Sequence, residues 1–336
     1  MKLNYVTCEY STNLINNGGG AKANEDIVKI LKNKYSEFLL PIFDSKLTKL
    51  SYSFFEISKN ISNLKKGNIF LIQYPLHSKI VLKTLLKNLQ HTDFKVVIII
   101  HDLLSLQRYG GNPAKVKSEI TLLNQADGII SHNEVMTKWL ISKGLQKSVV
   151  NLELFDYLTN VEPNSNLKLH KRIYFAGNLG KSKFLNNVKF KTPMDVYGAY
   201  PPNNMINSIN YKGKVSPDVL PQLLTEGFGL IWDGNDTKSC SGNFGEYMKY
   251  NNPHKASLYL SAGIPLIVWD QSAIAKFVNK KHVGLTIKNL DEIDTLLNNL
   301  NINEFKNMKQ NALDISSKVR KGYFLKRALK KLDQLI

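Results

Sequence analysis

Two cationic side chains follow an Asn-Asn-Pro sequence in the second half of the chain. Asn251, Asn252 and Pro253 are typical cap and first-turn residues of a helix, and His254 and Lys255 come directly after them. The backbone amides and the positive dipole end of a helix start bind anions. A cation there is disfavoured by roughly 0.3–1 kcal/mol unless an anion is bound. The sequence therefore predicts a diphosphate-binding site with Asn252, His254 and Lys255, although a solvated surface lysine has the same spacing.

The residues just before this predicted helix could bind a sugar. Gly245 permits close backbone approach, Glu246 offers a carboxylate to hydroxyl groups, and Tyr247 and Tyr250 offer aromatic faces. Together with the anion site, they indicate a ligand that carries both phosphate and sugar. We therefore place Glu246 and Tyr247 in the same predicted binding site.

Two aspartates follow a predicted strand in the sequence Trp-Asp-Gly-Asn-Asp. Asp233 comes at the end of that strand, where ligands of open parallel sheets bind, and Asp236 comes three residues later. The pair could hold a metal ion, but Asp beside Gly is also common in turns. We assign Asp233 to the ligand site and expect no metal or cofactor, because helix amides and lysines can neutralise a diphosphate.

Two further clusters with chemical potential lie in the first half of the chain. His101 and Asp102 end the apolar strand at residues 95–102, where a base or a turn cap could stand. Gly18, Gly19 and Gly20 precede Lys22 and a helix that Asn24 is expected to cap, so this loop could face a phosphate or a second substrate. The Gly-Gly-Gly run lacks the spacing of the dinucleotide fingerprint, and an ordinary turn explains it equally well.

Continuous apolar runs alternate with amphipathic helical patterns along the whole chain. Predicted strands include residues 68–75, 95–102, 128–133 and 172–178, the last of which ends in Gly177 and Asn178 and is followed by Lys181. A continuous apolar strand is typical of a parallel sheet covered on both faces. We predict an α/β fold of two Rossmann-like domains with a cleft between them.

The polar segment 160–171 contains Pro163 and is predicted to be a linker. It separates an N-terminal domain at residues 1–158 from a C-terminal domain at residues 171–318. Residues 319–336 are predicted to form a basic helix that crosses back to the N-terminal domain. Helices are also expected at residues 45–64, 217–224 and 253–262, with a long loop before the last.

The chain carries 45 Lys and Arg residues against 27 Asp and Glu residues, a formal charge of +18, which favours an anionic partner. No dense basic arm and no basic-aromatic alternation is present, so we expect no nucleic acid partner. Two cysteines are too few for a disulfide framework, and no apolar run reaches the length of a membrane span. We expect a cytoplasmic protein at the inner membrane face, and a homo-oligomer is compatible with the sequence.

Several motifs resemble those of a known enzyme family. They are Ile-His-Asp-Leu, Asp-Gly-Ile-Ile-Ser-His-Asn, Phe-Asp-Tyr-Leu, Tyr-Phe-Ala-Gly-Asn-Leu and, above all, the block at residues 232–255 with the following Ile-Pro-Leu-Ile-Val-Trp-Asp. The chain is similar, over nearly its whole length, to bacterial β-1,6-galactofuranosyltransferases of polysaccharide assembly. A wider group that it resembles uses UDP-glucose to extend glycans on serine-rich adhesins. The resemblance implies the GT-B fold of glycosyltransferases.

The resemblance also implies roles for individual residues. Lys255 and Lys181 match positions that meet the nucleotide diphosphate, and Tyr211 lies near the expected uracil or ribose contact. The adhesin enzymes carry Arg where this chain has Lys181, so a bidentate contact is lost there. Gly177 and Asn178 precede Lys181 and are expected to form a turn that faces the phosphates.

The reaction implied is inverting transfer of galactofuranose from UDP-galactofuranose to a sugar hydroxyl of a glycan acceptor, which in such pathways is lipid-linked. The acceptor must lose a proton, and Asp102, then His101, then Asp26 are the candidate bases. A UDP-glucose-dependent transferase is the first alternative, and a nucleotide-sugar epimerase or a basic nucleic-acid-binding protein are others. An anionic membrane could also be a partner, through the basic run at residues 320–331.

Overall fold

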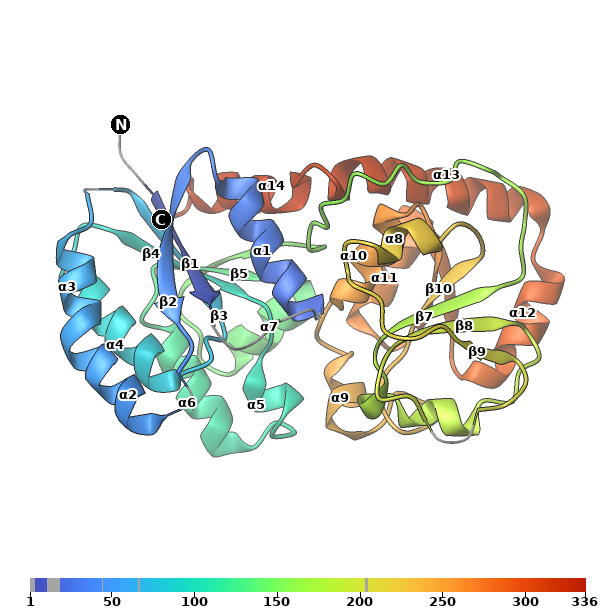
Figure 1. The fold of residues 1–336 in the computed structure, drawn as a ribbon, viewed down its shortest axis with the longest axis horizontal. Coiled ribbons are helices and arrows are strands. Elements are labelled where there is room, and N and C mark those ends of the chain that lie inside the picture. Colours follow the sequence, from blue (N-terminus) through green and yellow to red (C-terminus); the bar gives the residue numbers. More distant parts are fainter. Residues whose placement is uncertain (1–3, 11–18, 44, 66, 203–204) are drawn as a thin grey trace. The chain divides into compact units, whose positions relative to one another are not determined.

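The computed structural model describes residues 4–10, 19–43, 45–65, 67–202 and 205–336 (Figure 1). The chain divides into two compact units. The N-terminal unit is built mainly from Asn24–Leu152, with Lys326–Ile336 added to it, and the C-terminal unit from Glu153–Leu325, with the first turn of the first helix added to it. Each unit holds one parallel sheet, which confirms the predicted α/β fold with two Rossmann-like domains.

The sheet of the N-terminal unit has the strand order β2-β1-β3-β4-β5-β6, and its neighbouring strands pair in parallel. Its strands are β1 (Asn4–Tyr10), β2 (Tyr35–Pro41), β3 (Ile69–Tyr74), β4 (Lys95–Ile100), β5 (Gly128–Ser131) and β6 (Ser148–Asn151). Every residue of β3 and β5 is buried, and so is every residue of β4 after Lys95. These runs are rich in Ile and Val because both faces of a parallel sheet are covered.

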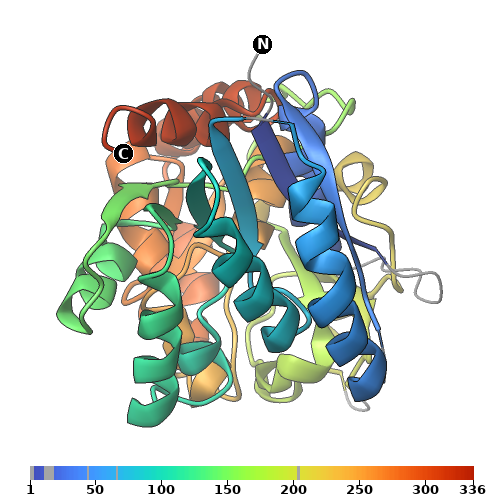
Figure 2. The same ribbon diagram turned by 90° about the vertical axis from the view of Figure 1, so that its left-hand side faces the viewer.

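Helices connect these strands (Figures 1 and 2). They are α1 (Gly19–Leu31), α2 (Lys46–Ser51), the π-turn η1 (Tyr52–Glu56), α3 (Ile57–Ser62), α4 (Lys79–Leu89), α5 (Leu104–Gln107), α6 (Pro113–Leu123) and α7 (Glu134–Ser142). The last helix, α14 (Tyr323–Leu332), packs its Leu332 beside Gly128 at the start of β5. The first turns of α1 and α14 belong to the C-terminal unit, and the remainder of each helix belongs to the N-terminal unit.

The sheet of the C-terminal unit has the order β12-β11-β10-β7-β8-β9, also parallel. Its strands are β7 (Ile173–Asn178), β8 (Met194–Ala199), β9 (Ile209–Tyr211), β10 (Phe228–Ile231), β11 (Leu266–Trp269) and β12 (Gly284–Ile287). Counted from β7 this is the 3-2-1-4-5-6 order of dinucleotide-binding folds. The strand order reverses between β7 and β10, so ligands are expected beyond the carboxyl ends of these two strands.

The helices of the C-terminal unit are mostly short until the last one. They are η2 (Leu179–Lys181), η3 (Lys183–Asn187), α8 (Leu220–Leu223), α9 (Gly242–Tyr247), α10 (His254–Ser261), α11 (Ala273–Lys281), η4 (Leu290–Glu292), α12 (Ile293–Asn299) and α13 (Ile302–Val319). Within the described part of the chain, no helix is long and apolar enough to span a membrane.

The structure corrects four local predictions. Asn24 caps nothing, because α1 begins at Gly19 and Asn24 lies inside it. The predicted loop before α10 contains α9, and the predicted helix at 217–224 shrinks to α8. The predicted helix at 45–64 is interrupted by η1, where the amide of Ile57 donates to the carbonyl of Tyr52 in a π-type turn.

Candidate functional site

The carboxyl ends of β7 and β10 carry the residues that the sequence placed in a ligand site. Gly177 and Asn178 end β7 and are exposed, while Trp232 and Asp233 directly follow β10. The Asn178 side chain accepts a hydrogen bond from the Gly180 amide at 3.1 Å, which turns the chain into η2. These residues therefore meet at the reversal point of the strand order, where a ligand of this fold class would lie.

The turn after β7 depends on a glycine in the neighbouring strand. Gly198 in β8 has φ +155°, and a Cβ atom there would lie 1.9 Å from the carbonyl oxygen of Gly177. At Gly177 itself an added Cβ would meet no atom within 4 Å. The backbone at the end of β7 thus packs closely against β8, whereas the space into which a side chain of Gly177 would point is empty of atoms from the described residues.

The helix α10 is fixed against the sheet by Tyr259. The ring of Tyr259 occupies the place of a side chain at Gly229 in β10, where a Cβ would be 2.2 Å from it. Its hydroxyl accepts the backbone amide of Ala176 in β7 at 2.8 Å, which satisfies a buried donor. One aromatic side chain therefore joins α10 to both strands of the reversal point and directs the start of α10 toward their ends.

Pro253 occupies the N-cap of α10 in an extended conformation, and no described side chain caps this helix start. The prediction that Asn252 belongs to the cap is wrong in its detail, because the Asn252 amide group donates to the carbonyl oxygen of Glu153. His254 and Lys255 are the first two residues of α10, as predicted. The first turn of α10 thus combines uncapped backbone amides with the side chains of His254 and Lys255.

Lys255 lies half-buried among the residues of the reversal point. Its Nζ donates to the carbonyl oxygen of Trp232 at 3.0 Å and lies 4.7 Å from the ring centroid of Phe175. Burial lowers the pKa of Lys255; Asp233 and Cys240 oppose this shift, and the like charge of Lys181 adds to it. An enclosed place with two lysines near one aspartate favours an anion, whose charge would relieve the burial cost.

Lys181 is exposed at the end of η2, with its Nζ 4.3 Å from the ring centroid of Phe244 in α9. The segment that joins β10 to α9 packs closely against the start of α9. A Cβ at Gly234 would lie 2.1 Å from the carbonyl of Ser241, and one at Gly245 would lie 2.4 Å from the carbonyl carbon of Cys240. Close backbone contacts, rather than a flexible loop, therefore place Phe244 under Lys181.

The other predicted binding residues have protein partners. Asp233 Oδ1 accepts the Gly234 amide at 2.9 Å, and Glu246 pairs with Lys249 at 2.7 Å on the surface. Tyr247 is buried, and the Tyr211 hydroxyl donates to the carbonyl of Gly198 at 2.9 Å. The reversal point therefore brings together Lys255, Lys181, Asp233 and the end of β7. Glu246 and Tyr247 belong to the neighbouring helix α9.

Lys22 and His254, which the sequence assigned to different sites, belong to one cluster in the C-terminal unit. Lys22 donates to the carbonyl of Leu158 at 2.8 Å, pairs with Asp218 at 3.1 Å and lies 5.1 Å from the centroid of Tyr157. The imidazole of His254 stacks on Tyr157 at 5.1 Å. Burial, together with the charge of Lys22, lowers the pKa of His254 to about 4, so His254 is neutral at pH 7.

Two of the loop glycines precede this cluster. Gly19 and Gly20 form the start of α1, and Gly18 lies outside the described residues. The first turn of α1 is attached to the C-terminal unit by the contacts of Lys22. The structure thus brings Lys22 together with the first residue of α10.

The candidate bases of the N-terminal unit follow β4. His101 Nε2 lies 3.0 Å from the Gln73 side-chain oxygen, and the His101 amide donates to the carbonyl of Tyr74 at 2.7 Å. Asp102 follows, half-buried, on a non-helical segment before α5. Asp26, the third candidate, is completely buried within α1.

Two residues that support this segment were missed from the sequence. His132, after β5, contacts the carbonyl of Ile100 at 3.0 Å, and burial lowers its pKa to about 4. Glu119 accepts the amides of Leu104 and Ser105 at 2.9 and 3.1 Å. A sequence signal for His132 existed: His132 and Asn133 follow β5 in the same way that His101 and Asp102 follow the neighbouring strand β4.

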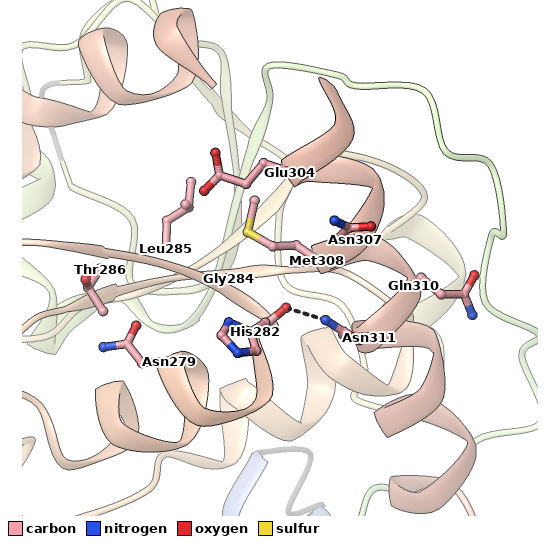
Figure 3. A pocket seen from close by; sticks show the side chains of 10 residues that line it. All are labelled: Asn279, His282, Gly284, Leu285, Thr286, Glu304, Asn307, Met308, Gln310 and Asn311. Carbon is pink, nitrogen blue, oxygen red and sulfur yellow. Dashed lines mark hydrogen bonds between the residues drawn. The ribbon is translucent and has the colours of Figure 1, made fainter. Parts of the chain in front are cut away.

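A hollow of about 700 Å³ lies elsewhere in the C-terminal unit, at the edge strand β12 (Figure 3). It lies beside the end of α11 and the start of α13, where the Asn311 side chain donates to the carbonyl of His282 at 3.1 Å. Its lining residues are Asn279, His282, Gly284, Leu285, Thr286, Glu304, Asn307, Met308, Gln310 and Asn311. None of the predicted site residues lines it, so it is separate from the reversal point.

Among the described residues, no group of three or more His, Cys, Asp or Glu side chains could hold a metal ion. Asp236, the second carboxylate of the metal alternative, accepts the Lys238 amide at 2.8 Å in its own turn.

Comparison with known proteins shows that the chain is similar to glycosyltransferases. The profile described as "Glucosyltransferase 3-like, N-terminal domain" matches residues 4–154, and the corresponding C-terminal domain matches residues 173–332. The chain is 28% identical to the β-1,6-galactofuranosyltransferase WbbI of Escherichia coli K12, over 93% of this chain and 94% of that protein. It is 26% identical to glucosyltransferase 3 of Streptococcus gordonii, over 91% and 92% of the two chains.

Solved structures agree on the fold. A trehalose-6-phosphate synthase superposes with a TM-score of 0.65 at 10% identity, covering 100% of both chains. The sucrose-phosphate synthase of Thermosynechococcus elongatus superposes with a TM-score of 0.63 at 10% identity, covering 100% of this chain and 98% of that one. These neighbours confirm the predicted GT-B fold.

Proposed function

Since the chain belongs to the glucosyltransferase 3-like family and is a glycosyltransferase, we propose that it transfers galactofuranose from UDP-galactofuranose to a hydroxyl of a glycan. A nucleotide-sugar donor and a glycan acceptor are the substrates common to such enzymes. The observation that carries the proposal is Lys255, which lies half-buried at the start of α10 beside Lys181 and Asp233.

The donor diphosphate is proposed to lie at the start of α10. As the sugar leaves, UDP gains negative charge, and groups aimed at that charge lower the barrier. Lys255, Lys181 and the uncapped amides of α10 supply positive potential there. Asn178 and the open backbone at Gly177 leave room for the phosphates to approach the end of β7. Tyr211 stays our proposed contact to the uracil or ribose, from the edge strand β9.

Acceptor activation is proposed to use Asp102. Inverting transfer needs a base that removes the proton of the attacking hydroxyl. Asp102 lies between two anchored backbone groups, the Ile100 carbonyl that His132 contacts and the Leu104 amide that Glu119 accepts, so its position is well defined. His101 is the second candidate, although its Nε2 is already engaged by Gln73.

The choice of galactofuranose is supported by the galactofuranosyltransferase relative, which matches over 93% of this chain. The alternative donor is UDP-glucose, supported by the streptococcal relative at 26% identity. Incubating the protein with UDP-galactofuranose, UDP-galactopyranose or UDP-glucose and simple glucoside acceptors, followed by product analysis, separates the two. A β-linked galactofuranosyl product supports the proposal, whereas glucosyl transfer alone would replace it with the alternative.

The diphosphate is proposed to need no metal, since two lysines and helix amides face it. Transfer measured with EDTA and with added Mg²⁺ tests this directly. Equal rates in both support metal-free binding of UDP, and a rate that requires Mg²⁺ would give the Asp233 carboxylate a different role.

In the cell the acceptor is proposed to be a growing surface polysaccharide on a lipid carrier, met at the inner face of the membrane. Lipid-linked and water-soluble glycosides of the same sugar, offered side by side, distinguish this acceptor from a soluble glycan. A strong preference for the lipid-linked form would support a membrane setting.

A further inference from the structure

The outer side of α2, η1 and α3 in the N-terminal unit exposes large apolar side chains. The inner side buries Ser53, Ile57 and Ile61, and this helical segment packs against α4. On the outer side, Leu47 is 80% exposed and Phe55 is 75% exposed, and Leu50 is also exposed. Figure 2 views the unit from this side, with the segment and α4 in front of the sheet. Exposed apolar groups that gather in one place usually mark an interaction surface.

The π-type turn brings these side chains onto one face. Leu47 and Phe55 are eight residues apart, which in a regular α-helix would separate them by about 80° around the axis, at about 100° per residue. A π-turn takes up one extra residue. The separation then falls to about 20°, and both side chains project from the same side of the segment. The interruption at Ile57 and Tyr52 thus creates an apolar stripe that the α-helical pattern alone would not give.

Basic residues lie along this segment. Residues 45–66 carry five lysines and a single acidic residue, Glu56. Lys59 is exposed and lies four residues after Phe55, on the same side of the segment, and Lys65 is exposed just beyond the end of α3. We call Leu47, Leu50, Phe55, Lys59 and Lys65 the α2–α3 patch.

The basic run near the C-terminus is less available than its sequence suggests. Arg320 forms a two-pronged ion pair with Glu162 at 3.0 and 2.6 Å, and Arg327 donates to the carbonyl of Leu152 at 3.1 Å. Two arginines of that run therefore already bind groups of the protein itself. The α2–α3 patch, by contrast, combines lysines with exposed apolar side chains.

We propose that the α2–α3 patch docks on a membrane surface of anionic lipid headgroups. An amphipathic helix with Phe and Leu on one side and lysines beside them lies in such an interface with its apolar side chains among the headgroups. A second copy of this chain fits less well, because two patches face to face would bring their lysines together. The inference deepens the proposed function by giving the enzyme a place beside a lipid-linked acceptor.

The test compares binding to vesicles of phosphatidylglycerol mixed with phosphatidylcholine and to vesicles of phosphatidylcholine alone. We expect sedimentation of the full-length protein with the anionic vesicles only, and its reversal by salt. Leu47→Ser with Phe55→Ser should weaken binding by about tenfold to a hundredfold, because two apolar groups no longer enter the interface. Lys59→Gln with Lys65→Gln should weaken it by about tenfold or more.

A matched pair of substitutions lies on α7 of the same unit. Ile141 is 55% exposed and Lys143 is exposed, so Ile141→Ser with Lys143→Gln removes similar groups outside the patch. We expect this control to bind vesicles as the wild type does. All variants should keep the thermal unfolding midpoint and the rate on a water-soluble glycoside, which separates docking from the transfer reaction.

Two outcomes would overturn the proposal. Patch variants that bind anionic vesicles as well as the wild type would show that charge elsewhere is responsible. Patch variants that change an oligomer into a monomer in light scattering, with no vesicle binding by the wild type, would assign the patch to a second copy of the chain. Loss of transfer to every acceptor by the wild type, with vesicle binding retained, would instead contradict the proposed function alone.

Discussion

The Nζ of Lys255 donates to the backbone carbonyl of Trp232 at 3.0 Å, across the gap between the start of α10 and the end of β10. A lysine held by one carbonyl and an aromatic face has donors left for a further acceptor, because an ammonium group has three. The strand end and the helix start are therefore joined by a group that also suits a phosphate.

Replacing Lys255 with Met should weaken UDP binding. One charge-assisted contact to the diphosphate contributes roughly 1.5–3 kcal/mol, so affinity should fall about tenfold to a hundredfold. Lys183→Gln, an exposed lysine in η3, is the matched control and should bind UDP normally. Titration calorimetry measures both, and wild-type affinity in Lys255→Met would remove the diphosphate from this place.

The pKa of Lys255 is lowered by burial, which gives UDP binding a pH dependence. A bound diphosphate favours the protonated lysine, so affinity should decline as pH rises through the lowered pKa of the free protein. Calorimetry at pH values on both sides of this titration should show proton uptake on binding between them, and the Lys255→Met variant should lose it. A pH dependence that is unchanged in the variant would assign the titration to another group.

Asp102→Asn should slow transfer without weakening UDP binding. The amide keeps the shape of the carboxylate but accepts no proton, so the rate should fall by about 10²–10⁴. His101→Asn is the companion variant and should affect the rate less if Asp102 is the base. A near-normal rate in Asp102→Asn, measured by product formation at saturating donor, would move the role to His101.

Tyr259→Phe should destabilise the C-terminal unit by about 1–3 kcal/mol, because the buried Ala176 amide loses its acceptor. Gly229→Ala should cost a similar amount, about 1–3 kcal/mol, since the Tyr259 ring must shift to admit a methyl group. Tyr200→Phe, at a tyrosine that is 71% exposed, is the control and should be neutral. Denaturant unfolding followed by tryptophan fluorescence compares the three variants.

Lys309 should make the stability of the C-terminal unit depend on alkaline pH. This buried lysine in α13 donates to the Gly263 carbonyl at 2.7 Å, and burial lowers its pKa from 10.5 to about 8. Between these two values the unfolded chain holds a proton that the folded chain has lost. The free energy of unfolding should therefore rise from pH 8 to pH 10.5, by at most about 3 kcal/mol.

The comparison that isolates this effect is Lys309→Met, which has no proton to exchange. The difference in unfolding free energy between wild type and Lys309→Met should change with pH only in that window. Lys306→Met, an exposed lysine on the same helix, should show no such change. A pH-independent difference at Lys309 would mean that its pKa in the folded protein is ordinary.

The sequence by itself determined the elements and the kinds of side chains at their ends. Apolar runs such as that of β4 and the alternating helices are set by neighbouring residues, so periodicity predicts two parallel sheets. His101 and Asp102 after β4, and Lys255 at the start of α10, could be placed for the same reason. The family resemblance supplied the GT-B fold and the class of reaction, which no local pattern contains.

Only the tertiary structure decided which ends meet and what each side chain contacts. The reversal between β7 and β10 depends on strand pairing, and the position of α10 depends on Tyr259 filling the space at Gly229. The cluster of Lys22 and His254 joins residues more than two hundred positions apart. Such contacts are chosen by packing and charge between distant segments, which local sequence does not encode.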